Sequence, residues 1–351
     1  MKVQLLNKIS PEGLKHFDVS MYETGDNFDD YDAILVRSAS LHEMEFPQSL
    51  KCIARAGAGV NNIPLQRCSE QGIVVFNTPG ANANAVKELT IAGLLLASRK
   101  IVKGIEWVKT LDPKDIAKTV EKGKSQFAGP EIMGKKLGVI GLGAIGVQVA
   151  NAAAALGMDV YGYDPYISVN AAWTLKARIH HITQLKTIFE ECDYITLHLP
   201  LLDSTRGMLN EEAFAQMKDG VRIVNFARDG LIEQDALISA IENGKVAAFV
   251  TDFADEKLLH LEQVIITPHL GASTPESEDN CARMAVEETR EYLETGNIRN
   301  SVNMPALSLE PSAQNRICII NRNVPNMVAK ISSQLGQYGI NIETMANKAR
   351  G

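Results

Sequence analysis

Three short polar segments contain residues that could move a hydride to or from a hydroxy acid. They are residues 225–231 (NFARDGL), 251–256 (TDFADE) and 267–274 (TPHLGAST), and each follows a predicted strand. Oxidation of a 2-hydroxy acid needs a cation for the carboxylate, a base for the hydroxyl proton and a group that orients the base. Taken singly, each charged residue has an ordinary explanation, such as a surface ion pair or a solvated loop. As an ordered set, the three segments indicate a catalytic site.

A glycine-rich loop lies upstream of these segments. It follows the predicted strand 137–140, opens a predicted helix over 145–156, and consists of Gly141, Leu142, Gly143, Ala144, Ile145 and Gly146. The first glycine permits a tight turn, the second lets the backbone approach a pyrophosphate, and the third lets helix and strand pack closely. Asp164 ends the next predicted strand, where it can accept hydrogen bonds from ribose hydroxyls and would repel a 2′-phosphate. The pattern predicts a dinucleotide site that prefers NAD to NADP.

A flavin is the rival ligand for such a loop. Flavoproteins commonly place the motif near the N-terminus, whereas about 140 residues precede it here. That position predicts a separate domain ahead of the cofactor domain.

The order of apolar runs predicts an α/β fold. Short β-rich runs alternate with helix-compatible stretches, a pattern that is typical of parallel sheets with helices on both faces. A first series of strands lies at residues 3–6, 33–37, 52–56 and 73–76, and a second at 137–140, 160–163, 194–197, 223–226, 248–251 and 264–266. Long helices are expected over 86–100 and from Ser273 or Thr274 to Thr295, and the second could return the chain to the first domain.

Composition and charge exclude several classes of protein. The chain has 351 residues, 45% of them hydrophobic, and a net charge of −7 without a Lys/Arg run, so we expect no nucleic-acid partner. Its five cysteines are far apart, which disfavours a disulfide framework or a zinc ribbon and favours a reducing cytoplasm. No apolar run approaches the ~20 residues that cross a bilayer, and no histidine or cysteine cluster has metal-ligand spacing. We therefore expect no membrane segment and no metal.

Six ordered motifs resemble the D-isomer-specific 2-hydroxyacid dehydrogenase family, and within it the D-3-phosphoglycerate dehydrogenases. They are RAGAGVN from Arg55, NTP from Asn77, the glycine loop, HLP from His198, the Arg228 segment and TPHLGAST. The resemblance covers residues 1 to about 305 and implies two doubly wound domains, Rossmann-like or flavodoxin-like, with a cleft between them. It implies a substrate-binding domain over 1–86 and 272–305 and an NAD-binding domain over 87–271.

The resemblance also implies an Arg/Glu/His catalytic set. Arg228 would grip the substrate carboxylate, a bidentate task that suits a guanidinium. His269 would take the hydroxyl proton, and a glutamate bonded to its other ring nitrogen would fix its tautomer. Family members often carry that glutamate five residues after the aspartate that matches Asp252, but Lys257 stands there in this sequence. Glu256 is therefore the first choice for the glutamate, with Asp255 second.

Further family positions extend the site. Beyond the glycine loop and Asp164, the NAD site would include Thr78, His198, Pro200, Ala227, Asp252, Gly271 and Ala272. The substrate site would include Arg37, Ser38, Arg55, Ala56, Gly57 and Asn77. Arg37 and Arg55 are candidate phosphate ligands, although either could be an ordinary surface arginine.

The C-terminal residues resemble the first half of an ACT domain, which is a ferredoxin-like regulatory unit. After a predicted linker over 305–311, a strand is expected over 316–321, a helix over 327–338 and an extended piece over 341–345. Asn323 and Asn341 match asparagines that hold L-serine in serine-regulated relatives. Asn321 and Asn326 replace the usual histidine and glycine, so a structural remnant over 313–351 is the alternative.

The expected function is oxidation of 3-phospho-D-glycerate to 3-phosphohydroxypyruvate with NAD, the first step of L-serine biosynthesis. One alternative is a dehydrogenase of another D-2-hydroxy acid, such as lactate, or a reductase of glyoxylate or hydroxypyruvate. The other is an NAD-sensing protein of the corepressor type. We expect a cytoplasmic homodimer or homotetramer with a small-molecule substrate.

Overall fold

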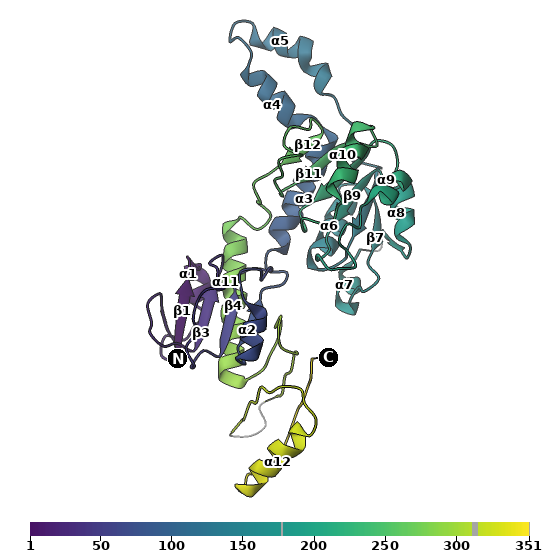
Figure 1. Cartoon of the computed structure of the whole chain (residues 1–351). Coiled ribbons are helices and arrows are strands. Elements are labelled where there is room, and N and C mark those ends of the chain that lie inside the picture. The colour runs from purple at the N-terminus through teal and green to yellow at the C-terminus, as the bar shows by residue number, and fades with distance from the viewer. Residues whose placement is uncertain (177, 311–314, 351) are drawn as a thin grey trace. The chain divides into compact units, whose positions relative to one another are not determined.

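The computed structural model describes residues 1–176, 178–310 and 315–350, in which the apolar runs form two parallel sheets (Figure 1). Contacts divide the chain into two units. Unit 1 contains Met1–Asn82 and Thr274–Gly351, and unit 2 contains Ala83–Ser273. The predicted α/β fold with parallel sheets is confirmed.

The sheet of unit 1 has five parallel strands in the order β2-β1-β3-β4-β5. This is the flavodoxin-like order, whose switch point lies between β1 and β3. The sequence analysis missed β2, a short strand at the edge of the sheet. The strands are β1 (Lys2–Leu6), β2 (Glu23–Gly25), β3 (Ala33–Val36), β4 (Cys52–Arg55) and β5 (Val74–Asn77).

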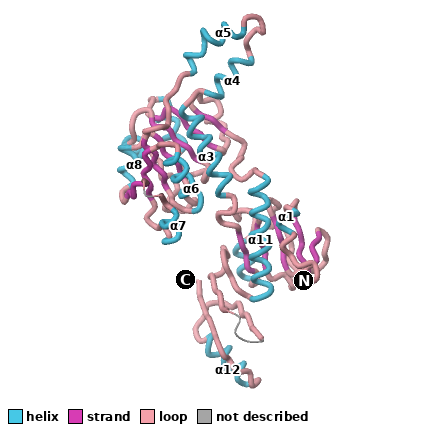
Figure 2. The backbone as a smooth tube through the Cα atoms, turned by 180° about the vertical axis from the view of Figure 1, so that it is seen from behind, coloured by secondary structure: helices cyan, strands magenta, loops and turns pink. Residues whose placement is uncertain are grey.

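Both faces of this sheet are apolar. Successive strand residues point to opposite sides, so a strand that is apolar throughout contributes to the core on each face. In β3, Ala33 and Leu35 pack in the core beneath α11 (Pro275–Thr295), whereas Ile34 and Val36 pack with Cys68 of α2 (Leu65–Glu70). Helix α11 thus brings the chain back to the first sheet, and Figures 1 and 2 show it along the strands of unit 1. The short helix α1 (Pro11–Leu14) precedes β2.

The sheet of unit 2 has seven parallel strands in the order β12-β11-β10-β9-β6-β7-β8. This is the Rossmann order with a seventh strand, and its switch point lies between β6 and β9. The strands are β6 (Lys136–Ile140), β7 (Asp159–Tyr163), β8 (Ile179–Ile182), β9 (Tyr194–Leu197), β10 (Val221–Asn225), β11 (Val246–Thr251) and β12 (Val264–Ile266).

Helices cover both faces of the second sheet. Apolar residues of α3 (Ala83–Ser98) and α6 (Ala144–Ala155) form one core layer with alternate strand residues such as Leu137 and Val139. The other layer contains residues of α8 (Leu185–Glu191), α9 (Glu211–Gln216) and α10 (Gln234–Glu242). Helix α7 (Val169–Thr174) lies between β7 and β8. The two layers hold the carboxyl ends of the strands in place, and the candidate residues follow those ends.

Helices α4 (Ile101–Lys109) and α5 (Ile116–Gly123) extend away from the sheet of unit 2 (Figures 1 and 2). They are followed by the 3-10 turn η1 (Lys124–Phe127), whose Phe127 packs against Trp107 of α4 with ring centroids 5.1 Å apart. Ile105 is 53% exposed and Ile116 is 40% exposed. These helices therefore present apolar side chains that their own unit does not cover.

The C-terminal residues differ from the prediction. Residues 315–350 belong to unit 1, and the strand expected over 316–321 is absent. A strand needs a neighbour for its backbone hydrogen bonds, and no strand pairs with this segment within the described residues. Helix α12 (Met327–Gln337) forms, and the piece expected over 341–345 stays unpaired. The linker was predicted over 305–311, and residue 311 lies outside the described residues. Within it, Leu307 forms an antiparallel β-bridge with Ile298.

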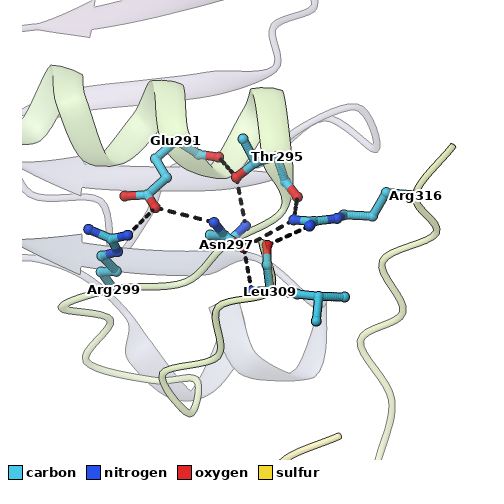
Figure 3. Close-up of polar contacts among 6 residues, drawn as sticks. All are labelled: Glu291, Thr295, Asn297, Arg299, Leu309 and Arg316. Carbon is cyan, nitrogen blue, oxygen red and sulfur yellow. Dashed lines mark hydrogen bonds and ion pairs between the residues drawn. The ribbon is translucent and has the colours of Figure 1, made fainter. Parts of the chain in front are cut away.

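Arg316 anchors this segment to the end of α11 (Figure 3). Its guanidinium donates to the Thr295 and Leu309 carbonyls, at 2.5 Å each, and to Asn297 Oδ1 at 3.0 Å. A cation is favourable there because the last carbonyls of a helix carry partial negative charge. None of the helices in the described ranges is long and apolar enough to cross a membrane.

Candidate active site

The glycine loop lies at the switch point of the second sheet, where β6 leads into α6. Gly141 has a φ of +97°, and a Cβ added there would lie 2.5 Å from the His198 carbonyl oxygen. A Cβ on Gly146 would lie 1.8 Å from the Gly141 carbonyl oxygen. At Gly143, by contrast, no heavy atom of the described residues lies within 4 Å of an added Cβ. Packing therefore requires two of the glycines, and the third faces open space.

Asp164 follows β7 and ties its end to this loop. Its Oδ2 accepts a hydrogen bond from the Leu142 N–H at 2.8 Å, and its Oδ1 accepts one from the Tyr166 N–H at 2.8 Å. The side chain is half-buried. Because each carboxylate oxygen can accept more than one hydrogen bond, the carboxylate keeps acceptor capacity for a hydroxyl.

These features fit a dinucleotide. Gly143 is the N-cap of α6 and gives the helix no side-chain cap, so the first N–H groups of α6 can bind an anion. The space above Gly143 is where a phosphate could approach the backbone. Beside the loop, the His198 N–H donates to the Ile140 carbonyl at 2.8 Å, and desolvation lowers the pKa of the His198 ring to about 3. This histidine is therefore neutral near pH 7. The candidate residues Ala144 and Ile145 lie in the first turn of α6.

Arg228 lies in a turn that follows β10. Asn225, which is 3% exposed, accepts the Ala227 N–H at 3.1 Å and donates from Nδ2 to the Arg228 carbonyl at 3.0 Å. The Arg228 side chain is exposed, and its Nη1 donates to the Ala227 carbonyl at 2.6 Å. The backbone of this turn is thus fixed from the core, while the guanidinium is accessible to a ligand.

His269 follows β12 in a strained conformation. Its φ is +50°, a region that few non-glycine residues adopt, and its N–H donates to the Thr267 carbonyl at 2.9 Å. The ring is exposed and meets the edge of the Phe253 ring, with centroids 5.5 Å apart and planes at 69°. Such strain persists where surrounding contacts enforce it, and it clusters at functional sites.

Asp252 follows β11 and is the buried carboxylate of this region. It is 4% exposed, its Oδ2 lies 3.4 Å from the Gly271 nitrogen, and its Oδ1 lacks a hydrogen-bond partner within the described part of the chain. Desolvation raises the pKa of Asp252, while the charges of His269 and Arg228 lower it. Asp252, His269 and Arg228 therefore share one electrostatic environment, and the unpaired oxygen is available to a ligand.

Glu256 and Asp255 lie apart from His269. Both are exposed, and no hydrogen bond joins either carboxylate to His269 among the residues that the structure describes. Asp255 Oδ1 instead accepts the Lys257 N–H at 2.8 Å. The choice of Glu256 as the histidine's partner stays a prediction.

Unit 1 contains the other candidate residues, at the carboxyl ends of β3, β4 and β5 and in the loops that follow. Arg55 Nε donates to the Arg37 carbonyl at 3.0 Å, and a Cβ on Gly57 would lie 2.7 Å from Arg55 Nη1. Asn77 Nδ2 donates to the Ala58 carbonyl at 2.6 Å, and the Thr78 N–H donates to the Gly57 carbonyl at 3.2 Å. These hydrogen bonds bring the three loops together.

Arg37 has an ionic partner. Its Nη1 lies 2.7 Å from Glu278 Oε1, at the start of α11. Ser38, the next residue, donates its N–H to Asn7 Oδ1 at 3.1 Å. Thr78 Oγ1 is buried and lacks a hydrogen-bond partner among the described residues.

The remaining candidate residues differ in their exposure to solvent. Ala56 and Gly271 are buried, Ala272 and Ala227 are half-buried, and Pro200 is exposed. Asn323 and Asn341 are exposed on the C-terminal segment, so their assignment to serine stays a prediction. No group of three or more His, Cys, Asp or Glu side chains could hold a metal ion within residues 1–176, 178–310 and 315–350.

Sequence reasoning missed three residues that shape these loops: Asn7, Asn225 and Glu278. Asn225 stands in a segment that was singled out, and an asparagine three residues before the arginine could have indicated a side chain that closes the turn. Asn7 and Glu278 act on loops far away in sequence. No local pattern indicates those contacts.

Known proteins support a family assignment. Residues 91–271 match the family model described as D-isomer specific 2-hydroxyacid dehydrogenase, NAD binding domain. The chain is 38% identical over 290 residues to D-3-phosphoglycerate dehydrogenase of Methanocaldococcus jannaschii, covering 80% of this chain and 53% of that one. It is 41% identical over 259 residues to hydroxypyruvate reductase of Thermotoga maritima, covering 70% and 80%.

A solved structure agrees with these matches. The NAD⁺-bound 3-phosphoglycerate dehydrogenase of Entamoeba histolytica superposes with a TM-score of 0.68 at 26% identity, over 86% of this chain and 98% of that one. The chain spans about half the length of several phosphoglycerate dehydrogenases that it matches, between 53% and 61%.

Proposed function

The chain belongs to the D-isomer-specific 2-hydroxyacid dehydrogenase family, and we propose that it oxidises 3-phospho-D-glycerate to 3-phosphohydroxypyruvate with NAD. The observation that carries the proposal is the common environment of Arg228, Asp252 and His269. They follow neighbouring strands of the sheet that also carries the glycine loop. Ligands of open parallel sheets bind at this edge.

Bound NAD supplies the acceptor for the hydride that leaves C2 of the hydroxy acid. The α6 N-terminus and Gly143 would hold its pyrophosphate, and Asp164 would bind its ribose. Asp252 would use its unpaired oxygen at the nicotinamide end.

The chain's own residues carry the rest of the chemistry. Arg228 binds the substrate carboxylate with two parallel N–H donors, because its side chain is exposed on a fixed turn. His269 accepts the proton of the C2 hydroxyl and returns it in the reverse reaction. The family implies a glutamate that assists His269, for which Glu256 is the first choice from the sequence, and the buried Asp252 is the alternative because the charge of His269 acts on it.

The substrate's phosphate would bind to Arg37 and Arg55 in unit 1. Arg37 follows β3 and Arg55 ends the adjacent strand β4, and the Arg55 side chain donates to the Arg37 carbonyl, which links the two positions. The names of several relatives support a phosphorylated substrate.

A second candidate is reduction of an unphosphorylated keto acid such as hydroxypyruvate. The relative from Thermotoga maritima is named hydroxypyruvate reductase, and the match covers 80% of its length. In addition, Glu278 forms an ion pair with Arg37, one of the candidate phosphate ligands. We also propose a homo-oligomer, because α4 and α5 expose apolar side chains.

The test is an NADH assay, followed by absorbance and fluorescence, across 2-keto acids with and without a phosphate. We expect turnover with 3-phosphohydroxypyruvate, and preference for an unphosphorylated acid would select the second candidate. His269→Gln should keep NADH binding and lose most turnover, and Arg228→Ala should also raise the substrate KM. Tight NADH binding without any turnover would indicate an NAD-sensing protein instead.

A further inference from the structure

The ion pair between Arg37 and Glu278 joins two parts of unit 1 that are far apart in sequence. Arg37 follows β3 at the carboxyl edge of the first sheet, and Glu278 lies in the first turn of α11. The Arg37 Nη1 to Glu278 Oε1 distance is 2.7 Å, and the two side chains are 38% and 42% exposed. The pair is thus formed and is open to solvent at the edge where ligands bind.

Both partners are held in place by their backbones. The Arg37 carbonyl accepts a hydrogen bond from Arg55 Nε at 3.0 Å, which links it to the next loop. Thr274 caps α11 by accepting the Ser277 N–H at 3.1 Å, so the turn that carries Glu278 is well formed. The positive end of the helix dipole also favours a carboxylate at this position. Glu278 therefore remains beside Arg37 without a ligand.

We propose that Glu278 is a specificity-determining residue whose carboxylate competes with a substrate phosphate for the Arg37 guanidinium. This inference rests on the proposed function, in which a hydroxy acid with or without a phosphate is the substrate. A phosphate that binds Arg37 must displace the carboxylate or lie next to it, and the two anions repel each other. Glu278 thus lowers the preference for phosphorylated over unphosphorylated acids.

A purely structural role would have different consequences. An exposed ion pair contributes little to folding, so loss of Glu278 should hardly change stability. Glu276 offers a matched control because it is exposed in the same turn of α11 and carries the same charge near the same dipole. Glu276 has no ion pair with Arg37 in the described residues.

The experiment is calorimetric titration of the whole chain, saturated with NADH, with 3-phospho-D-glycerate and with D-glycerate. NADH prevents turnover because oxidation needs NAD⁺. In Glu278→Gln, the ratio of the D-glycerate Kd to the phosphoglycerate Kd should rise about tenfold, as expected for removing one charge near a phosphate dianion in a largely aqueous site. Glu276→Gln should change that ratio by less than about twofold.

Arg37→Gln tests the same point from the other side. In that background the further change Glu278→Gln should no longer alter the ratio, because the shared guanidinium is gone. An unchanged or lower ratio in Glu278→Gln, or loss of phosphoglycerate binding, would overturn the inference. Turnover measured separately with NAD distinguishes the two failures: a chain that binds but oxidises neither acid contradicts the proposed function, while calorimetry still decides the role of Glu278.

Discussion

Two glycines of one loop should fail in different ways when each is replaced by alanine. At Gly146 an added Cβ would lie 1.8 Å from the Gly141 carbonyl oxygen, so the backbone of the loop would have to move. At Gly143 the same carbon meets no heavy atom within 4 Å among the described residues, and its φ of −76° suits alanine. We expect Gly146→Ala to damage folding and Gly143→Ala to damage cofactor binding.

The sizes of the two effects follow from this geometry. Overpacking at Gly146 should lower the free energy of unfolding by about 1–3 kcal/mol or more. For a domain of this size that lowers the Tm by roughly 2–4 °C per kcal/mol. Gly143→Ala should change stability by no more than about 1 kcal/mol, since glycine is only a moderate N-cap. A methyl group there should remove at least one charge-assisted hydrogen bond of about 1.5–3 kcal/mol to a pyrophosphate, which raises the NADH Kd by ten- to a hundredfold.

Calorimetric melting and NADH fluorescence titration measure the two effects independently. An NADH Kd within about twofold of the unchanged chain in Gly143→Ala would show that no phosphate approaches this backbone. An unchanged Tm in Gly146→Ala would show that the loop is not packed as described. Parallel losses of stability and affinity in both variants would refute the division of roles.

Three further predictions test other parts of the molecule. Asp252→Asn should lower turnover more than Glu256→Gln, because Asp252 is buried and shares an electrostatic environment with His269 and Arg228, whereas Glu256 is exposed; the reverse order would restore Glu256 as the partner. Burial raises the pKa of Glu288 to about 8, well above its ordinary value of 4.5. Its Oε1 accepts a hydrogen bond from Asn300 Nδ2 at 2.7 Å. The folded state favours protonated Glu288, so its contribution to stability is complete below pH 4.5 and is lost as the pH rises through 8. In Glu288→Gln, the Tm should therefore vary less between pH 5 and pH 8 than in the unchanged chain. Ile105→Asp should lower the mass measured by light scattering if α4 forms an interface, and an unchanged oligomer would exclude that surface.

Most strand positions could be predicted because the central strands, such as β3 and β9, are short apolar runs buried on both faces. Val139 and Ile140 belong to opposite core layers, which explains why both are apolar. The edge strands β2 and β8 have no buried residue, and the sequence analysis missed both. The apolar pattern of residues 316–321 predicted a strand that is absent, because a strand also requires a neighbour that the pattern cannot supply.

The glycine loop could be predicted for a related reason, since its constraints are local. Gly141 and Gly146 are required by atoms within the loop and by the adjoining strand end at His198. The ion pair of Arg37 with Glu278 depends instead on α11 returning to the first sheet. Contacts of that kind follow from topology, so they become visible only when the fold is known.

The loop that carries His269 shows which part of the proposed catalytic arrangement is set by the backbone. Holding a non-glycine residue at positive φ costs on the order of 1–3 kcal/mol, so the surrounding contacts must enforce it. The Thr267 N–H donates to the Thr251 carbonyl at 2.9 Å, the His269 N–H to the Thr267 carbonyl at 2.9 Å, and the Ser273 N–H to the Leu270 carbonyl at 3.0 Å. These bonds fix the backbone at His269 without any carboxylate partner. Replacement of a carboxylate near His269 should therefore leave the conformation of this loop unchanged.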